Sequence, residues 1–74
     1  MLMKEFRKLI SPIEILDIRS GTTDEQIKMC KANELTEEDM HLDVDIAYAS
    51  VYRNGDHYSG KLVLSVYQCV YEDN

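Results

Sequence analysis

Residues 42–71 read LDVDIAYASVYRNGDHYSGKLVLSVYQCVY, and the fold is expected to follow from them. Two runs rich in Val, Ile, Leu and Tyr lie on either side of Asn-Gly-Asp at 54–56. Asn-Gly between alternating apolar runs is the strongest short-range signal for a β-hairpin. We therefore predict a long hairpin with strands at 42–53 and 57–71.

The register of this hairpin follows from the alternation of side chains between the two faces of a strand. A two-residue turn at Asn54-Gly55 would place Asp45 opposite Leu64, which puts a carboxylate among core leucines. We therefore predict a three-residue loop at 54–56. The predicted pairs are Tyr48 with Leu62, Ile46 with Leu64 and Val44 with Val66. A two-residue turn with a one-residue bulge, for example near Gly60, would restore the same faces.

The sequence before the hairpin predicts a helix at 1–10, a strand at 13–19 and a second helix at 24–33. The second helix is indicated by Thr23 followed three residues later by Gln26, the pattern of a capping box. The predicted fold is a single small α+β domain in the order helix, strand, helix, strand, strand. Its sheet would be three-stranded and mainly antiparallel, and one further helical turn would begin near Thr36.

Length and composition indicate one globular domain. The chain has 74 residues, of which 45% are hydrophobic and 30% charged. A chain of this size buries only about 60% of the surface that its unfolded form exposes, so its stability is expected to be modest. Cys30 and Cys69 show no CxxC spacing, which favours reduced thiols. With no signal peptide and no apolar run of ~20 residues, we expect a cytoplasmic protein that does not bind membranes.

Negative charge is concentrated in the second half of the chain. Residues 1–33 carry five acidic and six basic side chains, a net charge of +1. Residues 34–74 carry nine acidic and two basic side chains, a net charge of −7. Nucleic-acid binding depends on clustered Lys and Arg that neutralise phosphates. Direct binding of nucleic acid is therefore not expected, and a protein with a basic surface is the expected partner.

The residue types most suggestive of chemistry are His41, Asp43 and Asp45. On a strand these three side chains project to one side, and imidazole with two carboxylates is a weak candidate site for Mn²⁺, Mg²⁺ or Zn²⁺. The predicted register also places Cys69 opposite His41, as a thiol nucleophile would require. A solvated strand face produces the same pattern, and no phosphate-binding loop, nucleophile elbow or HExxH motif occurs. We expect no cofactor and no enzymatic activity.

The second face of the hairpin combines small apolar residues with Tyr and Asp, which is typical of a binding face unless a helix covers it. The leading hypothesis is a non-enzymatic protein-binding module that docks on a basic surface, as small phage inhibitors do by imitating phosphate charge. The proposed central contacts are Tyr67, Tyr71, Asp43 and Asp45. The proposed rim is Glu37, Glu38 and Asp39. One alternative is a homo-oligomer formed through the hairpin, and another is a small metal-dependent enzyme using His41, Asp43 and Asp45.

Overall fold

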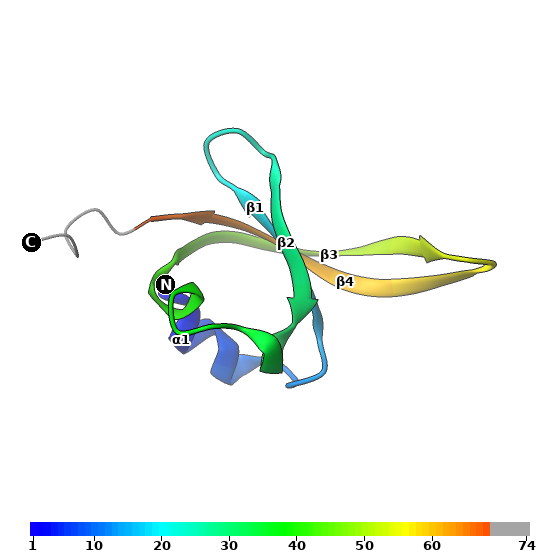
Figure 1. The fold of residues 1–74 in the computed structure, drawn as a ribbon, viewed down its shortest axis with the longest axis horizontal. Helices are drawn as coiled ribbons and strands as arrows, with labels where there is room; N and C mark the ends of the chain where they lie inside the picture. Colours follow the sequence, from blue (N-terminus) through cyan, green and yellow to red (C-terminus); the bar gives the residue numbers. More distant parts are fainter. Residues whose placement is uncertain (69–74) are drawn as a thin grey trace, which may run out of the picture.

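A four-stranded mixed sheet forms the body of the protein in the computed structural model, which describes residues 1–68 (Figure 1). Its strands are β1 (Ile15–Ser20), β2 (Gln26–Lys31), β3 (Asp43–Asn54) and β4 (His57–Tyr67). The strand order is β2-β1-β4-β3. The β1–β2 and β3–β4 pairs are antiparallel, whereas β1 and β4 are parallel. The prediction of a three-stranded, mainly antiparallel α+β domain is therefore wrong.

Helical structure is short. The helical segments are α1 (Met3–Phe6) and the 3₁₀ turns η1 (Arg7–Leu9), η2 (Ala32–Glu34) and η3 (Asp39–His41). The helix predicted at 1–10 is thus confined to residues 3–9, and the strand predicted at 13–19 lies at 15–20. The turn predicted near Thr36 is present, because Thr36 Oγ1 accepts a hydrogen bond from the Asp39 backbone N–H at 3.3 Å. No helix among the described residues is long and apolar enough to cross a membrane.

The helix predicted at 24–33 is instead strand β2. The local reason is that Thr23 does not cap a helix, because its Oγ1 accepts a hydrogen bond from the Glu25 backbone N–H in a turn. Ser20 Oγ shapes the same turn by accepting hydrogen bonds from the backbone N–H groups of Thr22 and Thr23. Asp24, in this turn, has a φ of 63°. A second reason is that an isolated helix of about ten residues is only marginally stable in water, so tertiary contacts can override it. The ladder with β1 satisfies the backbone groups on one edge of β2 instead.

The hairpin has a two-residue turn rather than the predicted three-residue loop. Asn54 pairs with His57, and Gly55 in the turn has a φ of +65°, which glycine adopts without strain. The register shifts at Asp45, which forms a one-residue bulge. The predicted alternative, a two-residue turn with a bulge, is therefore closer to the structure, although the bulge lies at Asp45 and not at Gly60.

The bulge decides which side chains enter the core. Val44 pairs with Val66, as predicted, because both lie beyond the bulge. On the other side of the bulge the predicted pairs of Tyr48 with Leu62 and Ile46 with Leu64 are wrong. The observed partners are Ala49 for Leu62, Ala47 for Leu64, Val63 for Tyr48 and Ser65 for Ile46. Ile46 and Tyr48 therefore lie on the face of the sheet opposite to Leu64.

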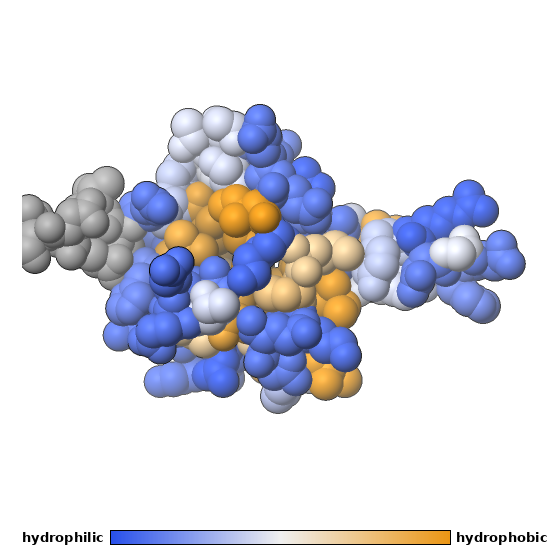
Figure 2. Space-filling view, in the orientation of Figure 1, coloured by the Kyte–Doolittle hydropathy of each residue, from blue (hydrophilic) through white to orange (hydrophobic). Residues whose placement is uncertain are grey.

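One face of the sheet is covered and forms the core. The N-terminal helical turns and the segment 32–42 pack on this face, with Met3, Leu16, Ile18 and Leu64 fully buried. The hairpin is longer than β1, which pairs with β4 only over 62–66, so the rest of the hairpin projects as a two-stranded arm (Figure 1). Figure 2 shows hydrophobic residues exposed across the middle of the molecule, while the arm is mainly hydrophilic.

Candidate protein-binding site

The opposite face of the sheet has no helical layer among the described elements. This open face is not the second hairpin face that the sequence predicted, because the small residues Ala47 and Ala49 pair with Leu64 and Leu62 on the covered side. Ile46 and Tyr48 take their place on the open side. Register places one residue of each strand in a row across this open face, namely Met29, Asp17, Val63 and Tyr48. The outer two members of the row are 44% and 55% exposed. This open face is the first of two candidate docking surfaces.

A buried carboxylate lies at the centre of the open face. Asp17 is fully buried, and its Oδ2 accepts hydrogen bonds from Lys61 Nζ at 2.8 Å and from Arg19 Nε and a terminal guanidinium nitrogen at 3.2 and 3.1 Å. Its Oδ1 accepts a hydrogen bond from Gln26 Nε2 at 3.0 Å. Burial alone would raise the pKa of Asp17, but these donors outweigh it and lower the pKa below the ordinary value. The network therefore keeps Asp17 ionised.

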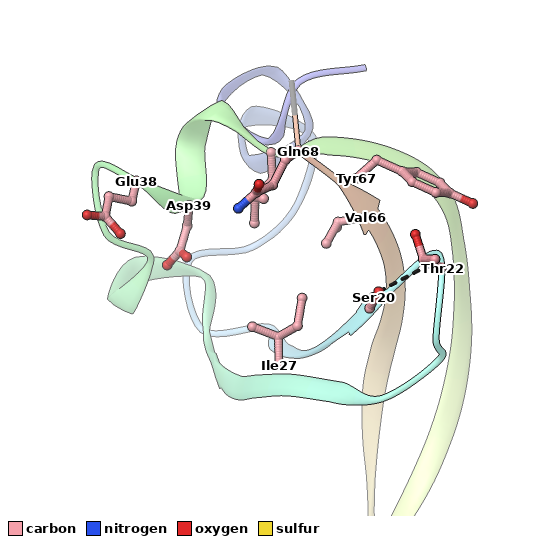
Figure 3. A pocket seen from close by; sticks show the side chains of 9 residues that line it. Ser20, Thr22, Ile27, Glu38, Asp39, Val66, Tyr67 and Gln68 are labelled. Carbon is pink, nitrogen blue, oxygen red and sulfur yellow. Dashed lines mark hydrogen bonds between the residues drawn. The ribbon is translucent and has the colours of Figure 1, made fainter. Parts of the chain in front are cut away.

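The second candidate surface is a pocket of about 610 Å³ at the end of the covered face. Its walls come from β1, β2, the end of β4 and the segment around η3. In Figure 3 the side chains of Ile27 and Val66 point into the pocket, Glu38 lies at its edge with the carboxylate directed outward, and the Tyr67 ring points away. Leu42 adds a further apolar side chain to the lining. The pocket thus combines an apolar floor with an acidic edge.

Asp39, the second acidic residue in the pocket lining, is held in place by an ion pair. Lys28 Nζ lies 2.7 Å from Asp39 Oδ2, and the same oxygen accepts a hydrogen bond from the Thr36 backbone N–H at 2.9 Å. Burial would raise the pKa of Asp39, but these donors lower it below the ordinary value. Asp39 is only 9% exposed. It therefore holds η3 in place and leaves the binding of a partner's cation to the exposed acids.

The structure divides the residues predicted for partner binding between the two surfaces. Glu37 and Glu38 are exposed beside the pocket, where Glu37 Oε1 lies 3.7 Å from His41 Nε2. Asp43, on the open face, pairs with Tyr67 in the register and accepts a hydrogen bond from the N-terminal ammonium at 2.9 Å. Tyr67 is 41% exposed and donates a hydrogen bond to the Gly21 carbonyl oxygen at 3.0 Å. Tyr71 lies outside the described residues.

The residues predicted as a weak metal site, His41, Asp43 and Asp45, do not come together as a set of metal ligands. Among residues 1–68 no three His, Cys, Asp or Glu side chains are placed to hold a metal ion. His41 belongs to η3 rather than to a strand, so it does not alternate with Asp43 as the prediction assumed. Asp45 is the extra residue of the bulge. Cys69, the predicted neighbour of His41, lies outside the described residues.

Sequence reasoning missed the buried Asp17 network. A signal was present, because Asp17 lies between Leu16 and Ile18 in a strand and Arg19 follows two residues later on the same face. A carboxylate in such a strand needs cationic or hydrogen-bonding partners. The contribution of Lys61, 44 residues away, could not be seen without the parallel β1–β4 pairing.

Comparison with known proteins gives no match: no family model fits the sequence, and no curated protein or solved structure is similar to it above chance.

Proposed function

We propose that this protein is a non-enzymatic protein-binding module that takes a basic, partly apolar segment of a partner protein at the pocket beside η3. The observation that supports the proposal is the combination of an apolar floor, formed by Ile27, Leu42 and Val66, with the exposed carboxylate of Glu38 at the edge. Glu37, the preceding residue, is exposed as well. An apolar side chain of the partner would enter the pocket, and neighbouring Lys or Arg side chains would meet the acidic edge.

Charge around the pocket favours a cationic partner. Between Glu34 and Asp39 the chain carries four acidic residues and neither Lys nor Arg. Lys28 reaches this region, but its charge is matched by Asp39. Glu37, whose side chain is 92% exposed, and Glu38 remain at the edge. Such a surface accelerates association with basic partners and weakens as salt screens the charges.

Proteins with basic surfaces commonly use them to hold nucleic acid. An acidic domain that occupies such a surface competes with phosphates for the same Lys and Arg side chains. We therefore propose that the module acts as an inhibitor or regulator of a nucleic-acid-binding partner. Direct contact with nucleic acid is not part of the proposal.

The test is affinity capture from the native host at about 50 mM salt, where charges are least screened, and at high salt. The informative bait carries Glu37→Lys and Glu38→Lys. Its matched control carries Glu5→Lys and Asp56→Lys, which change the net charge equally at exposed sites away from the pocket. Wild type and control are expected to retain the same basic partner at low salt, whereas the pocket variant loses it.

Direct binding then completes the test. The purified partner is titrated with wild-type protein, and displacement of nucleic acid from that partner is followed by fluorescence anisotropy. Equal retention by the pocket variant and the control would show that binding depends on net charge alone and not on the pocket. Binding without displacement of nucleic acid would contradict the inhibitory role.

A further inference from the structure

The outer edge of β3 is only partly covered by the rest of the described chain. β3 is the last strand in the order β2-β1-β4-β3, so β4 pairs with one of its two edges. At the start of the other edge, Leu2 bridges Asp43. The Val44 N–H donates a hydrogen bond to the Met1 carbonyl oxygen there, at 2.7 Å. Beyond these contacts no described strand pairs with this edge over 46–54, most of which belongs to the projecting arm (Figure 1).

This free edge, residues 46–54, lacks the features that keep strand edges apart. Edge strands are commonly protected by Pro, Lys, inward-pointing charges, bulges or a covering segment. The free edge reads IAYASVYRN, with no Pro, no Lys and no acidic residue. Its apolar members Ile46, Tyr48 and Val51 are 55%, 55% and 63% exposed. The free edge is therefore able to accept a further strand.

The backbone of the free edge directs hydrogen-bonding groups outward at every second residue. In an antiparallel ladder, pairs that exchange hydrogen bonds alternate with pairs that do not. A two-residue turn is closed by a bonded pair, which here is Asn54 with His57. Counting back from this pair, the residues whose N–H and C=O groups point away from β4 are Arg53, Val51, Ala49 and Ala47. These four residues lie symmetrically about Ser50.

The free edge is complementary to itself when a second copy runs antiparallel to it. A two-fold axis at Ser50 brings all the outward N–H and C=O groups of one copy opposite those of the other. The same axis places Tyr48 opposite Tyr52 of the second copy, and Ala49 opposite Val51 of the second copy. Each of these pairs occurs twice. Aromatic pairs and aliphatic pairs at opposed positions stabilise a ladder.

The charges at the two ends of this ladder are complementary as well. Arg53 is the single charged residue of the free edge, and it faces Ala47 of the second copy. Asp45 of that copy lies two residues further on, where a long side chain reaches a diagonal neighbour. Neither Arg53 nor Asp45 is part of an ion pair within residues 1–68. Arg53 Nε donates to the Gly55 carbonyl oxygen at 3.0 Å, which leaves the terminal nitrogens for a carboxylate.

We propose that the free edge of β3 pairs with the free edge of a second copy of this chain, giving a two-fold symmetric dimer in which the two sheets become continuous. The contact consists of one backbone ladder, two tyrosine pairs and two arginine–aspartate pairs. An interface of this kind belongs to the small, weak class. The dimer therefore dissociates on dilution, with a Kd of about 10–100 µM. This proposal does not involve the pocket or its acidic edge.

Sedimentation velocity from about 1 to about 500 µM tests the proposal, because this range spans the expected Kd. Val51→Pro removes one outward N–H group from the free edge, and proline is tolerated on an edge strand. Gly60→Pro is the matched control. Gly60 pairs with Val51, so its N–H points outward from the other strand of the arm, before the part of β4 that pairs with β1. Wild type and Gly60→Pro are expected to dimerise with the same Kd, whereas Val51→Pro raises the Kd at least tenfold.

Charge reversal tests the register and keeps the experiment decisive if a proline variant does not fold, which circular dichroism will show. Arg53→Glu and Asp45→Arg each bring like charges together at both ends of the ladder, and each should raise the Kd at least about threefold. The double variant keeps the net charge of the wild type and restores opposite charges. Its Kd is therefore expected to return to the wild-type value.

A wild-type monomer at every concentration would overturn the proposal. So would a dimer that Gly60→Pro weakens as much as Val51→Pro does, which would indicate pairing through β4. A double charge variant that dimerises no better than the single variants would contradict the register about Ser50. The Glu37→Lys and Glu38→Lys variant should dimerise as wild type does, so failure of either proposal is distinguishable from failure of the other.

Discussion

Lys61 on β4 donates a hydrogen bond to Asp17 on β1, with 2.8 Å between Nζ and Oδ2, and the contact joins residues 44 positions apart. Asp17 is fully buried, with a relative accessibility of 0%, so its carboxylate contacts hydrogen-bond donors of the protein and not water. The contact crosses the parallel β1–β4 pair, which is the junction between the β1–β2 hairpin and the β3–β4 hairpin. The two halves of the sheet are thus held together by an ion pair as well as by the backbone ladder.

Replacing Lys61 by Met should destabilise the protein by about 2 kcal/mol, because a buried carboxylate loses one of its two cations. Arg19 and Gln26 still donate to Asp17, which limits the loss. Urea unfolding measures the change. Lys8→Met removes an exposed lysine and is expected to change the free energy of unfolding by less than about 0.5 kcal/mol. Equal effects of the two variants would show that the Asp17 network contributes nothing specific.

Stability should fall in acid because of Asp17 and Asp39. The pKa of each is lower in the folded protein than the unfolded value of about 3.9, so the folded state binds protons less readily than the unfolded chain. The stabilisation is fully present above about pH 4 and is lost as pH falls through the folded pKa values. Urea unfolding between about pH 7 and pH 2 measures it. Asp17→Asn should be less stable at neutral pH and show a shallower loss below pH 4, and an unchanged slope would contradict the assignment.

Asp39 should stabilise the fold and Glu37 should not, although both were predicted as rim contacts. Asp39→Ala removes the partner of Lys28 and the acceptor for the Thr36 N–H, and is expected to cost about 2 kcal/mol of unfolding free energy. Glu37→Ala changes a side chain that is 92% exposed and should cost less than about 0.5 kcal/mol. Thermal or urea unfolding of both variants checks this difference. A stability loss for Glu37→Ala as large as that for Asp39→Ala would contradict it.

Gly21→Ala should act through Tyr67. A Cβ atom at Gly21 would lie 2.3 Å from Cζ of the tyrosine ring, so the ring must move. Because Tyr67 is 41% exposed, the ring can swing outward, and the expected cost is the lost packing and hydrogen bond, about 1 kcal/mol. A double-mutant cycle measures the coupling. In a Tyr67→Ala background the Gly21→Ala change should have little effect, and a full cost there would show that the backbone at Gly21, and not the ring, opposes a side chain.

The candidate surfaces were only partly accessible to sequence reasoning. The acidity around Glu37 and Glu38 follows from composition, because six acids without a base in twelve residues leave exposed carboxylates wherever that segment lies. Whether a given carboxylate faces a partner or the protein's own lysine depends on packing, as Asp39 shows. The open face could not be derived at all, since it depends on which side of the sheet the short helical segments cover.

The residues alone determined the β3–β4 hairpin and the turn that begins at Thr36, because alternation, an Asn-Gly turn and a hydroxyl cap act over neighbouring positions. Only the tertiary structure decided that residues 26–31 form a strand and not a helix, because the hydrogen bonds offered by β1 outweigh a weak local preference. It also decided the parallel β1–β4 pairing and the bulge at Asp45, which together bring Lys61 to Asp17 and turn Ile46 and Tyr48 outward. These features join distant parts of the chain, and no local pattern specifies which distant strands pair.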